Sequence, residues 1–312
     1  MPNKLAISVV IPTYQREGVL LDTLNALLGL EQGADEILVM DQTRAHDLET
    51  EQQLASWHEA GVIRWLRREH PSIPGAMNQG LVEARESVVL YLDDDIRPDA
   101  NLISAHLTAH QTADLIAGLV LQPGEQAFPL QPGEAFRFNS TEAAWVSEFI
   151  GCNFSVKRNV ALVLGGFDEN FIGAAYRFEA EFAHRYRASH GPIRFEPAAR
   201  IHHLQAPSGG TRAHGHHLRT VKPAHSVGAY YYWLRTRVPG WWWHILLRPL
   251  RAIRTRHHLR RPWWIPLTLF AEMRGLVTAL RLASQGPRLL HTHQPTDGDV
   301  GRLKPNLRSS RS

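Results

Sequence analysis

Short apolar runs alternate with amphipathic segments through the first 92 residues, and this alternation constrains the fold more than any other feature. The segments between the runs, at 18–30, 46–60 and 75–86, read as helices, the first of them with leucines at helical spacing. Alternating strands and helices are typical of βαβ units and a parallel sheet, so the predicted fold class is α/β. The predicted strands are Leu5–Ile11, Glu36–Met40, Val62–Leu66 and Val88–Leu92.

Polar residues follow three of these strands. Pro12–Arg16 comes after the first strand, Asp41 ends the second, and Asp93–Asp95 end the fourth. The carboxyl ends of parallel strands meet at one edge of a sheet, where ligands bind in such folds. We therefore expect these residues to share a binding site.

The three consecutive aspartates are costly at the end of a buried strand unless a cation neutralises them. One interpretation is a solvated acidic turn in which Asp95 or Asp99 caps the next helix. The other is a divalent metal site, since Mg²⁺ and Mn²⁺ take oxygen ligands. Side chains alternate along an extended segment, so Asp93 and Asp95 are expected to share a face while Asp94 points elsewhere.

The rest of the chain is predicted to fall into three parts. Residues 1–213 form the α/β domain, with further strands at Leu115–Leu121, Ile150–Val156 and Ile193–His203 and a helix at 176–189. Residues 214–290 form a helical, basic extension. Residues 291–312 lack periodic apolar positions and are expected to be disordered.

Charge is unevenly distributed along the chain. Residues 1–200 hold 16 Lys and Arg against 27 Asp and Glu, whereas residues 201–312 hold 18 against 3, together with six of the nine tryptophans. Basic residues with Trp beside apolar runs such as WWIPLTLF favour an anionic membrane surface over nucleic acid. A helical cap with buried Trp is the remaining alternative.

The expected location is cytoplasmic. The single cysteine, Cys152, excludes an intramolecular disulfide and suits a reducing compartment. The N-terminal apolar run ends early at a proline, so we expect no signal peptide. The longest uncharged apolar stretches near the C-terminus, Val238–Leu247 and Pro262–Ala271, are about half the length a bilayer-spanning helix needs.

Six short blocks in order resemble family 2 glycosyltransferases, an inverting family with the GT-A fold. They are ISVVIPTYQRE, EILVMDQT, AMNQG, YLDDDIRPD, GCNFSVKR and GGFDENF, within residues 5–215. The resemblance implies a Rossmann-like mixed sheet flanked by helices. It also implies metal-dependent transfer of a sugar from a nucleotide-sugar, a UDP- or dTDP-sugar, to a glycan or lipid-linked hydroxyl. With the basic extension, we expect surface polysaccharide or glycolipid synthesis, peripheral on the inner face of the cell membrane.

The same resemblance assigns roles to individual residues. Asp95 and His203 would hold Mn²⁺ or Mg²⁺, although a lone histidine also serves simply as a hydrogen-bonding group. Arg212 ends a Gly-containing loop, which either closes over the diphosphate or only connects to the C-terminal helices. Asp41 can alternatively cap a turn, and Asn78 can be an ordinary helix residue. The residues expected to bind the donor nucleotide are Pro12, Thr13, Tyr14, Arg16, Asp41, Asn78, Asp93, Asp94 and Arg212.

The catalytic base is assigned to a motif that departs from the family pattern. The acceptor hydroxyl must lose a proton as it attacks, which calls for a carboxylate. In RFEAEFAHR, Glu179 stands where the family has Asp, and Phe178 stands where Glu is common. Glu179 is therefore the predicted base. The alternative is a solvated helix in which Glu181 and Arg185 form an i,i+4 pair.

Two other function classes remain open from the sequence. A nucleotidyltransferase also binds metal through aspartates at strand ends, but it usually has a Gly-rich basic loop after the first strand, where this chain has PTYQRE. A non-catalytic protein that binds a nucleotide-sugar or a partner transferase is favoured only by the altered Phe178-Glu179 motif.

Overall fold

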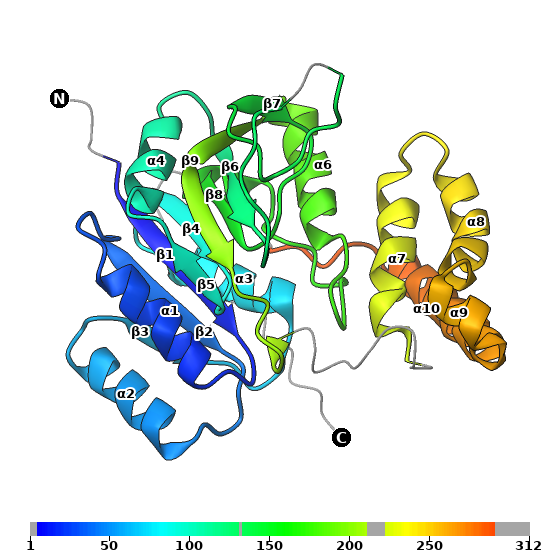
Figure 1. Cartoon of the computed structure of the whole chain (residues 1–312), viewed down its shortest axis with the longest axis horizontal. Coiled ribbons are helices and arrows are strands. Elements are labelled where there is room, and N and C mark those ends of the chain that lie inside the picture. Colours follow the sequence, from blue (N-terminus) through cyan, green and yellow to red (C-terminus); the bar gives the residue numbers. More distant parts are fainter. Residues whose placement is uncertain (1–4, 131–132, 211–221, 291–312) are drawn as a thin grey trace.

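A computed structural model describes residues 5–130, 133–210 and 222–290 of the 312-residue chain. One nine-stranded sheet runs through the molecule, with helices on both faces (Figure 1). The strands are β1 (Ile7–Thr13), β2 (Glu36–Asp41), β3 (Arg64–Arg67), β4 (Val88–Leu92), β5 (Ile96–Pro98), β6 (Leu115–Leu121), β7 (Ala144–Val146), β8 (Asn153–Lys157) and β9 (Ile193–His203). The α-helices are α1 (Gly18–Leu28), α2 (Leu48–Glu59), α3 (Ile73–Glu83), α4 (Leu102–Ala109), α5 (Arg158–Val163), α6 (Phe178–His190), α7 (Val227–Thr236), α8 (Trp241–Ile253), α9 (Arg256–Arg260) and α10 (Ile265–Gln285).

The sheet is mixed. Strands β3, β2, β1 and β4 are parallel neighbours, which confirms the βαβ pattern expected from the sequence. Strand β8 then runs antiparallel between β4 and β6, and β9 is parallel to β6. The full order is β3-β2-β1-β4-β8-β6-β9-β5, with β7 paired to β9. Reversal at β8 gives the mixed sheet that the family resemblance implied.

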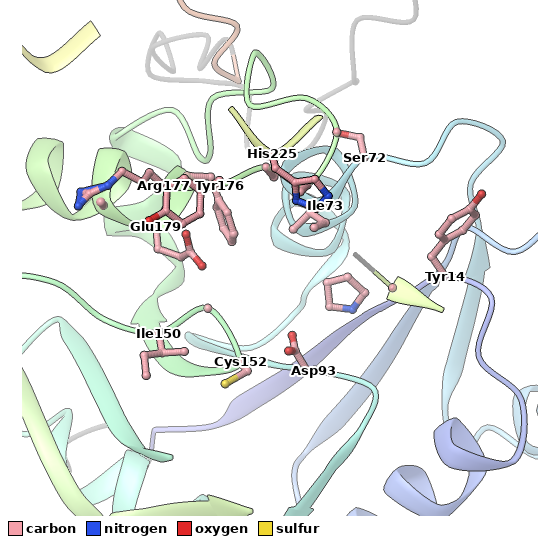
Figure 2. Close-up of a pocket in the computed structure, with 18 of the residues that line it drawn as sticks. Tyr14, Ser72, Ile73, Asp93, Ile150, Cys152, Tyr176, Arg177, Glu179 and His225 are labelled. Carbon is pink, nitrogen blue, oxygen red and sulfur yellow. The ribbon is translucent and has the colours of Figure 1, made fainter. Parts of the chain in front are cut away.

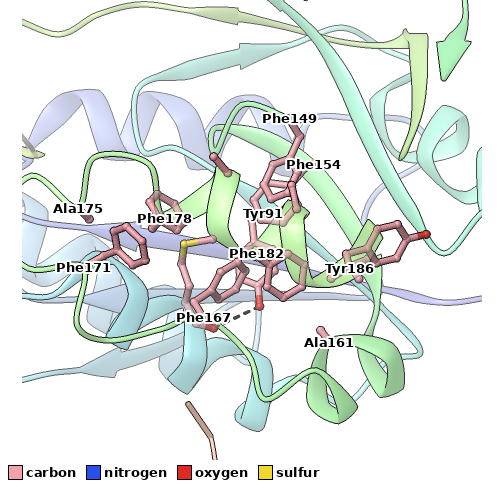
Figure 3. Close-up of a cluster of buried hydrophobic side chains, with 14 of the residues drawn as sticks. Tyr91, Phe149, Phe154, Ala161, Phe167, Phe171, Ala175, Phe178, Phe182 and Tyr186 are labelled. Carbon is pink, nitrogen blue, oxygen red and sulfur yellow. Dashed lines mark hydrogen bonds between the residues drawn. The ribbon is translucent and has the colours of Figure 1, made fainter. Parts of the chain in front are cut away.

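The two faces of the sheet carry separate cores because alternate strand residues point to opposite sides. Ile7, Val9 and Ile11 of β1 pack with helices α1, α2 and α4. Val10 of the same strand belongs to the other core, with α3, α5, α6 and α7. An aromatic cluster that includes Phe182 fills this second core beneath α6 (Figure 3).

Several short elements were missed from the sequence. β5 and β7 have three residues each and α5 has six, too few to show a period. The helix predicted at 46–60 begins instead at Leu48, because the Asp47 side chain accepts a hydrogen bond from the backbone of Thr50 (2.8 Å) and caps the helix.

The C-terminal helices are packed onto the α/β core. Residues such as Val227 and Tyr230 of α7 are fully buried in the core beneath α6. After α10 the chain returns to the loop that follows α5, where the Leu290 N–H donates to the Gly165 carbonyl (2.8 Å). The predicted boundary at residue 213 and the predicted disordered tail at 291–312 both lie outside the described residues. Within the described ranges, no helix has both the length and the apolar composition required to span a bilayer.

Candidate active site

A cavity of about 1180 Å³ opens at the carboxyl ends of β1 and β4, where the sequence predicted a binding site. Pro12, Thr13, Tyr14 and Arg16 line it from the end of β1. Figure 2 shows the carboxylates of Asp93 and Glu179 pointing into this space from different segments. Its volume exceeds the range of about 300–1,000 Å³ usual for a single small-ligand site, which leaves room for two molecules side by side.

Arg16 neutralises part of the negative charge of the three aspartates. Its guanidinium is buried, and Nε lies 3.1 Å from Asp94 Oδ1 and Nη2 lies 3.3 Å from Asp95 Oδ2. A further guanidinium nitrogen donates to the Ser208 carbonyl. Thr13 Oγ1 completes the set by donating to Asp94 Oδ2 (2.7 Å). Asp94 is therefore held by Thr13 and Arg16, which was not expected from the sequence.

Asp93, Asp95 and His203 form an acidic and imidazole cluster. One candidate ligand atom from each residue lies within 4.8 Å of the others. His203 Nε2 is 3.2 Å from Asp95 Oδ1 and 3.7 Å from Asp93 Oδ2. Hydrogen bonds from His203 and the Ala206 N–H outweigh burial and lower the pKa of Asp95, so this carboxylate is ionised at neutral pH. The two acids share a face, as alternation predicted.

Strand pairing selects His203 over His202. Ile96 of β5 pairs antiparallel with His203 of β9, directly after the three aspartates. His202 points the other way, with Nε2 3.3 Å from Asp99. His203 Nδ1 lies 3.0 Å from the Gln122 Oε1 acceptor and donates to it, which orients the ring so that Nε2 faces the aspartates. This geometry fits a divalent cation with two carboxylates and one imidazole.

Glu179 lies in the first turn of α6 and lines the cavity. Burial raises the pKa of Glu179 to about 7, and the charges of Asp93 and Glu148 act in the same direction. Two residues shortly before Glu179 have left-handed backbone conformations. They are Arg177, with a φ of 73°, and Ala175, with a φ of 50°. Such strained residues concentrate at functional sites, where they aim a side chain.

Glu181 has a different environment, because residues two apart on a helix point to nearly opposite sides. Its buried carboxylate accepts hydrogen bonds from Arg185 Nε (2.8 Å) and Nη2 (2.8 Å). Arg185 also donates to the carbonyls of Leu164 and Gly166, which ties α6 to the glycine-containing loop. Glu181 thus forms the predicted i,i+4 pair, and it is not among the residues that line the cavity.

Gly151 makes room for the Glu179 side chain. A Cβ atom at position 151 would lie 2.9 Å from Glu179 Oε1 and 3.2 Å from both Glu179 Cγ and Phe178 Cζ. The Gly151 N–H also hydrogen bonds to the carboxylate. Phe178, the other departure in the motif, is buried in the aromatic cluster 5.8 Å from the Phe167 ring centroid. Gly151 was not singled out from the sequence, since no local pattern connects residue 151 to residue 179.

Substituting Gly151 by Ala is expected to lower kcat about tenfold, because the new methyl group displaces the carboxylate by several tenths of an ångström. Donor binding should be unchanged, as measured by calorimetry. Gly18→Ala is the matched control: a Cβ there meets no atom within 4 Å, so kcat should stay within about twofold. Equal kcat for Gly151→Ala and wild type would show that Gly151 does not position Glu179.

The structure places Asp41 and Asn78 away from the cavity. Asp41 is fully buried and accepts from the Thr43 N–H (2.8 Å), His46 Nε2 (2.9 Å) and Trp65 Nε1 (2.9 Å). These hydrogen bonds outweigh burial and lower the pKa of Asp41. Asp41 does not line the cavity, and its expected role in binding the donor nucleotide stays a prediction.

Asn78 instead holds the loop that carries the GGFDENF block. Its side chain donates to the Phe167 carbonyl (2.8 Å) and accepts from the Phe167 N–H (2.7 Å), and it is almost completely buried. Asn78 does not line the cavity either, and its expected role in binding the donor nucleotide stays a prediction. Arg212, the last predicted donor residue, lies outside the described residues.

Known proteins resemble this chain in sequence and in fold. The sequence model of the family described as "Glycosyl transferase family 2" matches residues 8–195. Among curated proteins, no sequence matches the chain. Solved structures match over most of its length.

Three solved structures illustrate the likeness. The structure of GalNAc-T7 with UDP, GalNAc and Mn²⁺ has a TM-score of 0.59 at 15% identity and covers 90% of this chain, which in turn spans 55% of that one. Residues 1–349 of S. aureus TarS with UDP-GlcNAc have a TM-score of 0.56 at 12% identity, covering 90% and 91% of the two chains. The mannosyltransferase PcManGT from Pyrobaculum calidifontis with GDP-Man and Mn²⁺ has a TM-score of 0.52 at 17% identity, covering 92% and 77%. At these identities the likeness shows a shared GT-A fold.

Proposed function

Since the chain belongs to glycosyl transferase family 2 and is a glycosyltransferase, we propose that it transfers a sugar, with inversion, from a nucleotide-sugar to a hydroxyl acceptor in a metal-dependent reaction. The observation that carries this proposal is one cavity bounded both by the Asp93, Asp95 and His203 cluster and by Glu179. The first group suits the diphosphate side of a donor. The second suits proton removal from an acceptor.

The cluster of Asp93, Asp95 and His203 is the proposed metal site. These three side chains would hold a divalent ion, which would supply Lewis-acid stabilisation of the charge on the departing nucleoside diphosphate. Mn²⁺ is the first choice, because His203 supplies an imidazole ligand and Mg²⁺ prefers oxygen ligands throughout. The Mn²⁺ in the GalNAc-T7 and PcManGT structures supports the same choice.

Glu179 is the proposed general base. A carboxylate whose pKa lies near 7 accepts a proton more readily than an ordinary glutamate, and about half of it is still ionised at neutral pH. Glu181 is a poorer candidate, since its carboxylate is engaged by Arg185.

The donor is proposed to be a UDP-sugar, with dTDP-sugars as the second choice. Pro12, Thr13 and Tyr14 border the part of the cavity nearest the metal cluster, where a nucleoside would lie. UDP or UDP-GlcNAc is bound in two of the similar structures and GDP-Man in the third, so the nucleotide must be determined by experiment.

The acceptor is proposed to enter from the C-terminal helices. The cavity is also lined by three basic side chains near the C-terminal helices, those of Lys222, His225 and Arg251. Cationic walls suit an acceptor that carries phosphate, such as a lipid-linked glycan. We therefore place the reaction in surface polysaccharide or glycolipid synthesis.

The rate should depend on pH through Glu179. Its pKa is raised to about 7, so the base is protonated and inactive at low pH and becomes active as pH rises. We expect kcat to increase about tenfold per pH unit below 7 and to level off above it. A profile that is flat from pH 5 to pH 9 would contradict Glu179 as the base.

A donor panel tests the proposal directly. Release of nucleoside diphosphate is measured from UDP-, dTDP- and GDP-sugars with Mn²⁺, with Mg²⁺ and with EDTA, using membrane extract as the source of acceptor. Release from one donor that EDTA abolishes and extract increases is the expected result. Donor binding by calorimetry without release under any condition would contradict the proposed transfer.

A further inference from the structure

Helix α10 exposes large apolar side chains, although Leu276, Leu282 and Ala283 pack partly buried against the core. The face that it turns to the rest of the protein carries small or polar residues that are buried, namely Thr268, Ala271, Glu272, Gly275 and Ala279. The opposite face carries large apolar side chains at helical spacing that are exposed: Phe270 (47%), Met273 (54%), Val277 (44%) and Leu280 (49%). A helix of a soluble globular protein turns most such side chains toward its core.

Helix α8 also exposes apolar side chains; it packs Trp241 and Ile245 against the core, and none of its residues is fully buried. Trp242, Trp243, Leu246 and Leu250 are exposed along it, and the two indole rings stack with centroids 4.1 Å apart. Helices α8 and α10 are in contact with each other. Figure 1 shows both beyond α7, at the end of the molecule away from β1 to β3. Exposed apolar area of this extent marks an interaction surface.

The charges around this surface have one sign. Residues 222–290 contain twelve Lys and Arg and a single acidic residue, Glu272, which is buried and paired with Arg248 (2.9 Å). Arg274 and Arg281 are exposed, each one turn after an exposed apolar residue, Phe270 and Val277. Two copies of such a face would repel each other, whereas an anionic surface would be attracted.

We propose that the exposed apolar faces of α8 and α10 bind the surface of an anionic lipid bilayer, with the apolar side chains at the acyl boundary and the arginines at the headgroups. Tryptophan and arginine are the residues favoured at that depth. No helix of the described ranges spans a bilayer, so this binding is peripheral.

The cavity adjoins the same helices. The faces of α8 and α10 that do not meet the bilayer line its far end, through Ala252 on one helix and Ala271 and Glu272 on the other. A molecule held in the bilayer by an acyl chain would thus lie close to the cavity. Membrane binding itself does not depend on the transfer reaction, and it can be tested without a donor.

The test is co-sedimentation of the full chain with vesicles of phosphatidylcholine, with and without phosphatidylglycerol. Wild type should bind the anionic vesicles and bind neutral ones about thirtyfold more weakly. The triple variant Phe270→Ser, Met273→Ser, Val277→Ser should bind the anionic vesicles about 100-fold more weakly. Arg274→Gln with Arg281→Gln should weaken binding about thirtyfold at low salt.

The matched control removes equally exposed apolar groups from the catalytic part, as Leu48→Ser, Trp145→Ser and Val163→Ser (73%, 53% and 77% exposed). These variants should bind vesicles like wild type. Circular dichroism melting identifies any variant that is not folded, and Met273→Ser alone then replaces the triple variant. Equal binding by the α10 variants and the control, or equal binding to neutral and anionic vesicles, would overturn the proposal. The proposal would also be overturned if light scattering showed that the wild type is a dimer that does not bind vesicles, and that the α10 variants are monomers.

Discussion

Substituting Glu179 by Gln is expected to lower kcat about 10³-fold while changing the KM for the donor by less than about twofold. Glutamine has the same size and fits the space beside Gly151, but it cannot take the proton of the acceptor hydroxyl. Because the side chain lies across the cavity from the metal cluster, donor binding should persist. Steady-state kinetics measure both quantities, with the donor that the panel of nucleotide-sugars selects. Calorimetry measures donor affinity.

Two further variants make this result specific. Glu181→Gln is the matched control: it breaks the buried pair with Arg185, so it should destabilise the fold by about 3 kcal/mol with little change in kcat of the folded enzyme. Glu179→Asp restores the residue usual in the family but shortens the side chain, and should retain about a tenth of the activity. If Glu181→Gln abolished turnover in folded protein while Glu179→Gln did not, the base would be Glu181.

Substituting Asp95 by Asn is expected to weaken Mn²⁺ binding at least about 100-fold and to abolish metal-dependent turnover. Asp95 is the most buried member of the cluster, and its lowered pKa keeps it charged. Asparagine preserves its shape and can still accept from the Ala206 N–H, so the loss is one of ligand charge. Mn²⁺ titration by calorimetry with bound nucleoside diphosphate gives the affinity, and nucleoside diphosphate release gives the turnover.

Asp99→Asn provides the control for this substitution. Asp99 lies four residues further on and pairs with Arg200 and His202, outside the cavity. Its replacement should change Mn²⁺ affinity and turnover by less than about twofold. Wild-type Mn²⁺ affinity in Asp95→Asn would show that the metal, if required, binds elsewhere.

The parallel half of the sheet could be predicted because its signals are local. Short apolar runs predicted strands β1 to β4, segments between them predicted helices, and their alternation predicted that the strands are parallel. The choice of His203 came from the family resemblance, and the structure places His203 beside Asp93 and Asp95. Six ordered blocks then identified the family, which the family match confirms.

What could not be predicted depends on partners distant in the sequence. The sequence around Asp41 gives no sign that Trp65 donates a hydrogen bond to it. Likewise, the sequence around Asn78 gives no sign of its hydrogen bond to Phe167. Arg16 was expected to face the nucleotide, yet it pairs with acids about 80 residues later. A polar residue at a strand end has the same local pattern whether it meets a ligand or another side chain. Only the folded arrangement distinguishes the two.

The junction between α7 and the loop after α5 has a consequence for how the chain reaches its native state. Tyr231 donates to Asp168 (2.6 Å), its ring meets Phe171, and the Arg288 N–H donates to Asp168 as well (2.9 Å). The region that matches the family model ends at residue 195. When the ribosome has synthesised that region, Tyr231 and Arg288 have not yet been made. During synthesis the loop after α5, which supports α6, therefore stays partly exposed until almost a third more of the chain has been synthesised. An expression fragment that ends near residue 213 would keep this loop exposed permanently and would be prone to aggregation.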